Sequence, residues 1–213
     1  MNHPPSTLTS RATLWAGLLG RCILLAGCSQ PTTTSVVQPP SEIVNLESRP
    51  TNLKTTLFQG ISLPVADQGP HSASGAVASG FDRNPIGASL AAVQTTVRMS
   101  VATDSQWVLV GQQMLAPGLG RDAWATARSQ ISITDPIAVN APKIAGYRVV
   151  NYTPDHAEIA IYTIESDHSI TRNTATVVWQ IGDWKLLLPT QPQSSPVTTV
   201  AELPTNLIAL PLQ

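Results

Sequence analysis

The stretch Thr174-Ala-Thr-Val-Val-Trp-Gln-Ile-Gly-Asp-Trp-Lys-Leu-Leu-Leu188 decides the fold that this chain of 213 residues is expected to adopt. Two apolar segments flank Gly182-Asp183, which suits a two-residue hairpin turn because such turns require a positive φ that glycine adopts readily. Side chains alternate between the two faces of a strand, so this turn predicts one strongly apolar face. That face carries three cross-strand pairs: Ile181 with Trp184, Trp179 with Leu186, and Val177 with Leu188. An apolar sheet face of this kind needs a helix packed on it.

Two more strands are predicted before this hairpin. Short apolar runs are separated by Thr153-Pro154-Asp155 and by Ser166-Asp167, which are typical turn residues. The pattern predicts an antiparallel meander of four strands: Ile144–Tyr152, Ala157–Ile164, Thr174–Ile181 and Trp184–Leu188.

Helices are predicted earlier in the chain. Asn84-Pro85 is a strong helix start, because asparagine caps a helix N-terminus and proline fits the first turn. Ser89, Gln94 and Arg98 mark a more polar side of this helix, which runs to about Ala102. Shorter helices are expected at Ser105–Leu115 and Arg121–Ile131. The apolar residues that define one face of the first helix are Ile86, Leu90, Val93, Val97 and Val101.

Helices followed by an antiparallel meander predict an α+β domain, with N-terminal helices packed on a sheet of about four strands. Ahead of the helices, Phe58–Pro64 suits a short extended segment. The stretch Gln68–Gly80 is rich in Gly, Ser and Ala and is predicted to be a loop.

The N-terminal part contains Leu25-Ala26-Gly27-Cys28, which has the form of a lipobox. Apolar residues that follow basic ones and end in two small residues and a cysteine are typical of a bacterial lipoprotein signal peptide. The sequence therefore predicts that residues 1–27 are removed and that Cys28 carries a lipid anchor on the extracytoplasmic face of the cell membrane. Arg21 interrupts the apolar stretch, so an uncleaved anchor and a cytosolic start with a chance lipobox are the alternatives.

Composition divides the rest of the chain into three parts. Residues 28–50 are rich in Pro, Thr and Ser and are predicted to form an extended tether. Residues 51–190 are predicted to form a single domain of ordinary size. Residues 191–213 form a Pro-rich C-terminal arm, which either packs on its own domain or docks on a partner.

Charge and cysteine content exclude several classes of protein. The chain has 12 basic and 13 acidic residues, and loss of Arg11 and Arg21 with the signal peptide leaves a net charge of −3. This balance argues against nucleic acid as the main partner, because nucleic-acid binding calls for a basic field. Both cysteines, Cys22 and Cys28, belong to the targeting segment, so the domain is expected to hold no disulfide and no thiolate metal site.

No catalytic or metal-ligating set of residues stands out. Asp155-His156 and Asp167-His168 flank one predicted strand and are expected at opposite ends of the sheet, where they cannot share a metal. His71 lies in the predicted loop without another ligand at metal-binding spacing. The sequence therefore predicts no enzyme and no cofactor. An enzymatic alternative would require Asp82, Asp122 or His71 to point into a cavity.

Four tryptophans lie in the predicted domain. Trp179 and Trp184 belong to the apolar sheet face and are expected in the core. Trp107 and Trp124 lie on the predicted second and third helices, where they are candidates to line a cavity between helices and sheet.

Short motifs of the predicted domain resemble those of a known group. These motifs are Gly80-Phe81, Pro85-x-Gly87-Ala88, Ala91-Ala92, Gly146-Tyr147, Tyr152-Thr153, Ala157 and Trp179-x-x-Gly182-Asp183-Trp184. Over Phe58–Pro189 they resemble actinobacterial envelope lipoproteins associated with conjugative elements and phages. The last hairpin is similar to the NTF2-like, cystatin-like domain of VirB8-type conjugation proteins. The resemblance implies a helix wrapped by a curved sheet and a part in a secretion or transfer machine, with no catalytic residues.

These observations predict a lipid-anchored, non-enzymatic assembly or scaffold protein of a bacterial cell-envelope complex. Its expected partners are the membrane, through the anchor, and other envelope proteins. Conjugative transfer or secretion is the role that the resemblance implies. The alternative is an envelope lipoprotein that binds a small ligand in a cavity between helices and sheet. Association into a homo-oligomer is left open.

The lipid anchor is tested by the substitution Cys28→Ser, which removes the thiol that would take up the lipid. We expect the intact mass of the chain to lose the lipid increment and the protein to leave the detergent phase. Unchanged mass and partitioning in the variant would exclude lipidation at this residue.

Overall fold

The computed structural model describes residues 44–190 and 195–211. The predicted signal peptide, Cys28 and most of the tether lie outside these described residues. Of the described residues, 37% lie in strands and 21% in helices. Within the same residues, no helix has the length and apolar character needed to cross a membrane.

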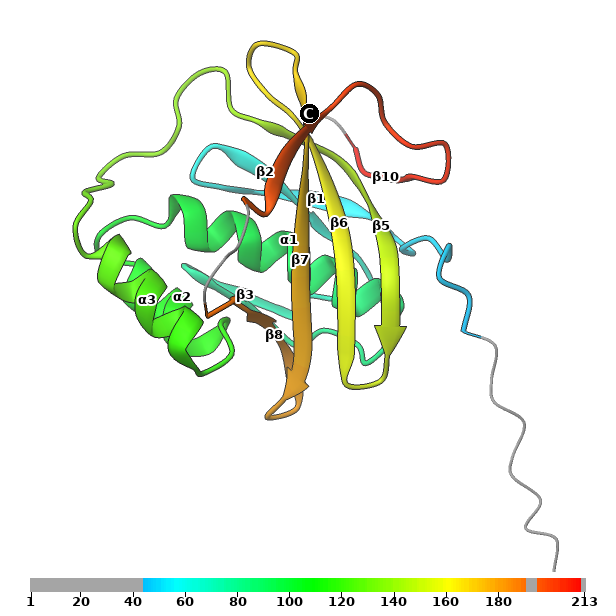
Figure 1. Ribbon diagram of the computed structural model, residues 1–213, viewed down its shortest axis with the longest axis horizontal. Helices are drawn as coiled ribbons and strands as arrows, with labels where there is room; N and C mark the ends of the chain where they lie inside the picture. Colours follow the sequence, from blue (N-terminus) through cyan, green and yellow to red (C-terminus); the bar gives the residue numbers. More distant parts are fainter. Residues whose placement is uncertain (1–43, 191–194, 212–213) are drawn as a thin grey trace, which may run out of the picture. The chain divides into compact units, whose positions relative to one another are not determined.

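The largest element is an antiparallel sheet of six strands (Figure 1). Its order is β10-β5-β6-β7-β8, and β9 pairs with a second part of β7. The strands are β5 (Lys143–Thr153), β6 (His156–Ile164), β7 (Ile170–Gln180), β8 (Asp183–Leu187), β9 (Val197–Val200) and β10 (Ile208–Ala209). The predicted NTF2-like fold, with helices packed on a curved sheet of about four strands, is therefore wrong. The four predicted strands are present as β5 to β8, but the sheet is larger and the domain is mostly β.

Two short hairpins precede the helices, where a short extended segment and a loop were expected. They are β1 (Lys54–Phe58) with β2 (Ile61–Val65), and β3 (Ser72–Ser74) with β4 (Val77–Ser79). Gln59 and Gly60 join β1 to β2, with φ values of 49° and 88°. Positive φ at both central residues is the geometry of a tight hairpin turn. Strands this short carry too few alternating side chains to be recognised in the sequence.

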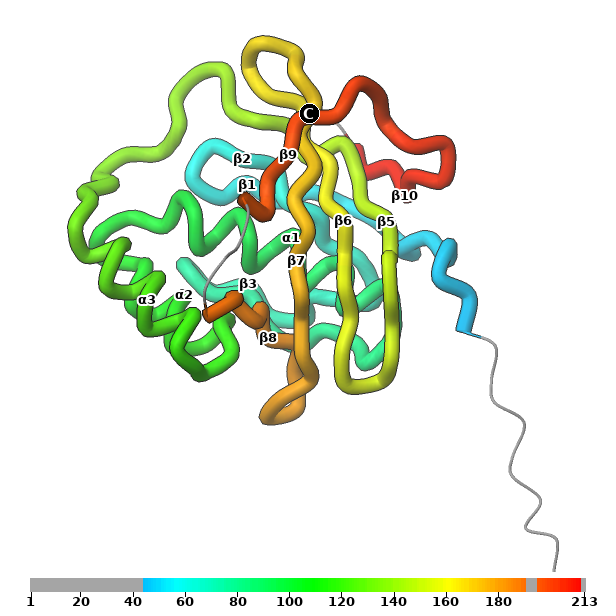
Figure 2. The backbone as a smooth tube through the Cα atoms, in the orientation of Figure 1, coloured from blue at the N-terminus to red at the C-terminus, as the bar shows by residue number. Residues whose placement is uncertain are grey.

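Helix α1 (Pro85–Val101) is buried on nearly all sides. It begins as predicted at Asn84, whose side chain accepts a hydrogen bond from the backbone N–H of Gly87 at 2.8 Å. The helix contacts β5 to β8 of the sheet and also β2 and β4 of the two hairpins (Figures 1 and 2). The two shorter helices are α2 (Trp107–Gln113) and α3 (Leu119–Arg128), which lie together at one side of the sheet.

The predicted polar side of α1 is inside the protein. Ser89 and Gln94 have no exposed surface, and Arg98 is only 2% exposed. The sequence predicted that this side is more polar, but it did not predict that the two hairpins cover it. Their backbone carbonyls supply the hydrogen-bond acceptors that buried polar side chains require.

Arg98 is held without a carboxylate among the described residues. Its Nη1 donates to the backbone oxygens of Gly75 and Ala76 at 3.0 and 2.9 Å, and its Nε donates to the side-chain oxygen of Gln94 at 2.9 Å. The guanidinium also lies 4.3 Å from the centre of the Phe58 ring. Burial lowers the pKa of Arg98 to about 10. The arginine thus ties the end of α1 to the β3–β4 turn and to β1.

The β7–β8 hairpin turns one residue earlier than predicted. Gln180 pairs with Asp183, Trp179 with Trp184 and Val177 with Leu186, so Ile181 and Gly182 form the turn. Both turn residues have positive φ, 54° and 73°. Ile181 consequently lies outside the core and is 96% exposed.

Hydrogen bonds to the side chain of Asp183 hold this residue in β8, outside the turn. Its carboxylate is buried and accepts the backbone N–H groups of Gly80 at 3.0 Å, Phe81 at 3.1 Å and Trp184 at 2.9 Å. The bonds to Gly80 and Phe81 fasten the start of β8 to the chain that leaves β4.

The C-terminal segment crosses the outer face of the sheet, the face opposite α1. It pairs through β9 with β7 and then, on the other edge, through β10 with β5 (Figure 2). Gly146 allows this approach, because a Cβ there would lie 2.4 Å from the Ile208 carbonyl oxygen. Over residues 195–211, the predicted arm therefore packs on its own domain. A small apolar cluster lies beneath it, made by Ala145, Ala160 and Tyr162 with Ile164, Val200, Leu203 and Leu207.

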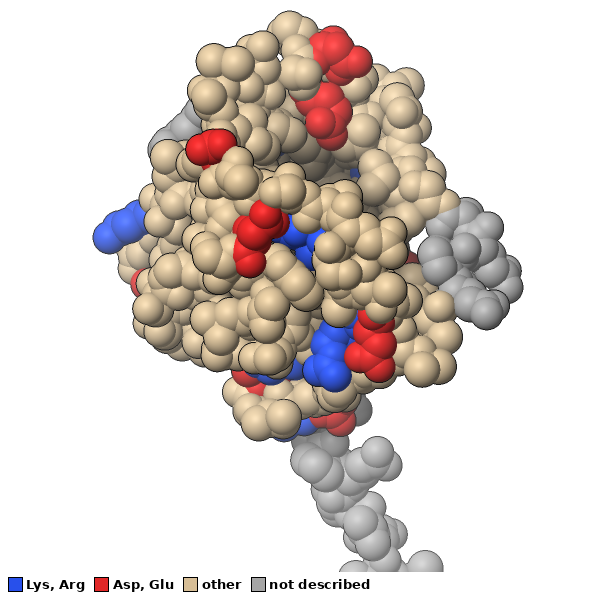
Figure 3. Space-filling model, turned by 90° about the vertical axis from the view of Figure 1, so that its left-hand side faces the viewer, with Lys and Arg blue, Asp and Glu red and all other residues tan. Residues whose placement is uncertain are grey.

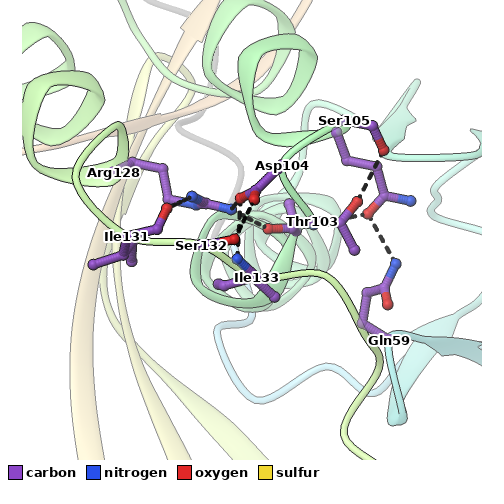
Figure 4. A network of polar contacts seen from close by, with 10 residues as sticks. Gln59, Thr103, Asp104, Ser105, Arg128, Ile131, Ser132 and Ile133 are labelled. Atoms are coloured by element: carbon purple, nitrogen blue, oxygen red, sulfur yellow. Dashed lines mark hydrogen bonds and ion pairs between the residues drawn. The ribbon is translucent and has the colours of Figure 1, made fainter.

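A second buried arginine joins the end of α1 to α3 and to the chain that follows α3 (Figure 4). Arg128 donates to the backbone oxygens of Ala102 and Ile131 at 2.9 and 2.8 Å, and it pairs with Asp104 at 3.0 Å. Asp104 also accepts the Ser132 hydroxyl at 2.6 Å and the Ile133 backbone N–H at 3.0 Å. The hydrogen bonds from Ser132 and Ile133, followed by that from Arg128, lower the pKa of Asp104 to about 2.

The role of Asp183 is tested by the substitution Asp183→Ala. It leaves the buried N–H group of Phe81 and the partly buried one of Gly80 without acceptors, which should lower the free energy of unfolding by about 2–4 kcal/mol in urea denaturation. The control is Asp122→Ala, which removes an exposed carboxylate and should change stability by about 0.5 kcal/mol or less. Equal stability of the two variants would contradict the anchoring role.

The Asp104 network predicts a pH dependence. The pKa of this carboxyl is depressed in the folded state, so its contribution to stability is present above its ordinary pKa of 3.8 and is lost as the pH falls through about 2. Removal of the Ser132 hydroxyl in Ser132→Ala should move the NMR titration midpoint of Asp104 up towards 3.8. Ser129→Ala is the control, because the Ser129 hydroxyl binds the Thr126 carbonyl instead and should leave the midpoint unchanged. A midpoint that stays near 2 in Ser132→Ala would refute the assigned cause.

Candidate functional site

A groove of about 660 Å³ lies where the edge of the sheet is interrupted between β8 and β9. The long strand β7 pairs with β8 along one part and with β9 along another, and both partners lie on the same edge. Thr176 pairs with Leu187 and Asn173 with Val197, so neither β8 nor β9 has a residue paired with Thr174 or Ala175. The groove exists because two short strands complete one long one.

The walls of the groove come from one helix, four strands of the sheet and the chain between β8 and β9. The end of α1 supplies Thr96, Met99 and Ser100, and the rest comes from the sheet edge. The sheet residues are His156 on β6, Asn173, Thr174, Ala175 and Thr176 on β7, Leu186 and Leu187 on β8, Leu188, Pro189, Thr190 and Pro196 after it, and Val197 on β9. The residues between Thr190 and Ser195 lie outside the described part of the chain.

The chemistry of the groove is that of a site for an apolar ligand. Eight of the fifteen lining residues are leucine, proline, methionine, valine or alanine, and the other seven carry hydroxyl, amide or imidazole groups. None of the lining residues is Asp, Glu, Lys or Arg. A concave apolar site with a few polar groups and a volume of about 300–1,000 Å³ is typical of small-molecule binding.

The predicted cavity tryptophans do not line this groove. Trp107 of α2 and Trp124 of α3 pack edge to face against each other, with ring centres 5.9 Å apart. Arg128 lies 5.7 Å from the centre of the Trp107 ring, and Gly111 lies against the Trp124 ring. These contacts join α2 to α3.

The residues considered for an enzyme lie at the surface. His71 Nε2 lies 3.0 Å from a carboxylate oxygen of Asp82, with side chains 55% and 42% exposed. Asp122 is still more exposed and lies beside Arg121. None of these three residues lines the groove.

The two Asp-His pairs lie at opposite ends of β6, as predicted. Asp155 forms an ion pair with Arg83, and Asp167 accepts the Ser169 backbone N–H at 2.9 Å. His156 is the one member of these pairs that reaches the groove. In the described ranges, no three His, Cys, Asp or Glu side chains come together as a metal site would require.

The sequence did not predict that the groove-lining residues form a groove. Leu186-Leu187-Leu188-Pro189 was interpreted as the end of a strand, and Pro196-Val197 as part of an arm. The sequence signals the interrupted edge strand only through proline: Pro189 and Pro196 lie on either side of a short stretch that follows an apolar strand.

The face formed by α2, α3 and the chain that follows α3 is mostly uncharged (Figure 3). The charged side chains on it form small groups of opposite sign, without an extended patch of either sign. This surface offers no broad electrostatic attraction for a highly charged partner.

Comparison with known proteins gives one result. Neither the curated proteins nor the solved structures include a significant match. A family model described as a domain of unknown function, DUF8175, matches residues 26–205. Because this match covers most of the sequence, from two residues before Cys28 to the C-terminal segment, the chain belongs to the DUF8175 family.

Proposed function

We propose that this protein is a lipid-anchored, non-enzymatic binding protein of the bacterial cell envelope. Its domain holds an apolar ligand in the groove between β8, β9 and the end of α1. The single observation that carries the proposal is the groove itself, with its volume of about 660 Å³ and its lining without Asp, Glu, Lys or Arg.

The lipobox supports the proposed location. The family match begins at Ala26, inside Leu25-Ala26-Gly27-Cys28, so the small residue before the cysteine, the cysteine and the tether all fall within the matched region. A domain at the membrane surface meets apolar molecules at high local concentration, which suits a site built from leucine, methionine and proline side chains.

The transfer or secretion role is not carried forward. The resemblance implied this role together with an NTF2-like fold, and the six-stranded sheet differs from that fold.

An assembly role is the second candidate, favoured by α2 and α3. These helices expose Val108, Leu109 and Leu119, and Leu119 is 68% exposed. Apolar side chains at a surface can form a protein interface when they are contiguous. Under this candidate the groove has no ligand, and an apolar probe would leave it unlabelled.

The binding function is tested with the full chain in membrane vesicles and a hexadecanol that carries a photoreactive diazirine. Labelled peptides identified by mass spectrometry should come from β7, the β8–β9 connection and the end of α1. The variant Thr174→Trp places an indole in the groove and should raise the half-saturating probe concentration about tenfold.

Thr199→Trp is the matched control. Thr199 is an exposed threonine on β9 that does not line the groove, so its replacement should leave labelling unchanged. Thermal unfolding of both variants verifies that the fold is intact. Labelling spread evenly over the domain, or equal labelling of the two variants, would exclude the groove as the binding site.

A further inference from the structure

We infer that the ligand of the groove is a neutral long-chain molecule with a hydroxyl head, and that this hydroxyl donates a hydrogen bond to the backbone carbonyl of Thr174. The inference rests on the proposed binding function and adds to it the class and orientation of the ligand. It comes from the backbone of β7, at the place where neither β8 nor β9 pairs with its edge.

The carbonyl of Thr174 points to the open edge of β7. The N–H of this residue donates to the backbone oxygen of Pro196 at 3.2 Å, and Pro196 lies directly before β9. In an antiparallel strand, the N–H and C=O groups of one residue point to the same neighbouring strand. Thr174 and Pro196 both line the groove, so this carbonyl lies at the groove wall.

Proline prevents the protein from supplying a donor to this carbonyl. Two residues that face each other in this way usually exchange two hydrogen bonds, but Pro196 has no N–H and can return none. The register of β8, continued from Thr176 and Leu187, reaches Pro189 at the position of Thr174, and this proline also lacks an N–H. In the described part of the chain, no backbone N–H on this edge donates to the Thr174 oxygen.

Two threonine side chains lie on one face beside this carbonyl. Thr174 and Thr176 are two positions apart on β7, so their side chains point to the same face at a spacing of about 6.7 Å. The methionine, leucine and remaining proline side chains of the lining come from the end of α1, from β8 and from the chain after it. A head group at Thr174 therefore has further polar partners, and an apolar chain can extend from it along the apolar part of the lining.

The lining favours a neutral head that donates a hydrogen bond. No Asp, Glu, Lys or Arg lines the groove, so a charged head would lose hydration without gaining an opposite charge. An ether oxygen only accepts hydrogen bonds and cannot bind a carbonyl. A hydroxyl donates to the carbonyl and can at the same time accept from a threonine hydroxyl. A long-chain alcohol meets these conditions.

The closing experiment compares two photoreactive probes with the same sixteen-carbon chain, the alcohol and its methyl ether, on the full chain in membrane vesicles. We expect the alcohol to half-saturate groove labelling at a concentration about tenfold lower than the ether, after correction for the amount of each probe in the vesicles. In detergent micelles, the NMR resonance of the Thr174 carbonyl carbon, detected through the Ala175 amide, should shift on addition of the alcohol and stay in place with the ether.

Pro196→Ala tests the carbonyl directly. It introduces an N–H in register with Thr174, which should donate to the carbonyl in place of the ligand and make the two probes about equal. Slow hydrogen exchange of the new amide verifies this bond. Pro204→Ala is the matched control, because Pro204 belongs to the same C-terminal segment but does not line the groove, so the alcohol should keep its advantage.

Equal half-saturating concentrations of the two probes on the wild type, with no shift of the Thr174 resonance, would overturn the inference and leave the binding function standing. A preference for the alcohol that persists in Pro196→Ala while the new amide is protected from exchange would also overturn it, because another group would then bind the hydroxyl. Absence of groove labelling by both probes would overturn the binding function itself.

Discussion

The burial of α1 on nearly every side is the constraint on which the rest of the domain depends. A helix that is apolar on one face can lie on a single sheet, but α1 also carries Gln94 and Arg98, which must find hydrogen-bond partners away from water. The β1–β2 and β3–β4 hairpins provide those partners through the carbonyls of Pro64, Gly75 and Ala76. Two short hairpins that have little core of their own are stabilised in return by packing on the helix.

The groove follows from a mismatch of strand length. β7 has 11 residues, whereas β8 has 5 and β9 has 4, so two partners are needed to satisfy the backbone groups along its edge. Neither partner pairs with Thr174 or Ala175, and the groove lies beside these two residues. The same C-terminal segment then pairs with β5 and covers a small apolar cluster on the outer face.

Much of the secondary structure was predictable from local pattern. The start of α1 at Asn84-Pro85 and the strands β5 to β8 follow from capping and alternation, which act within a few residues. The turn at Ile181-Gly182 was missed by one residue, because Asp183 is fixed by Gly80 and Phe81, about a hundred positions earlier. The groove was missed for a related reason, since its walls come from α1, β7 and the chain after β8.

The sequence by itself determined the long elements, the lipobox and the absence of a recognisable catalytic motif, because each is encoded by residues that are neighbours in the chain. Only the tertiary structure decided that the polar side of α1 is buried, that residues 195–211 pack on the sheet and that the end of α1, β7 and the chain after β8 line one groove. These features depend on backbone carbonyls and strand edges, whose hydrogen-bonding capacity is nearly the same in every residue. A side-chain pattern therefore cannot predict which distant segment will form hydrogen bonds with these backbone groups.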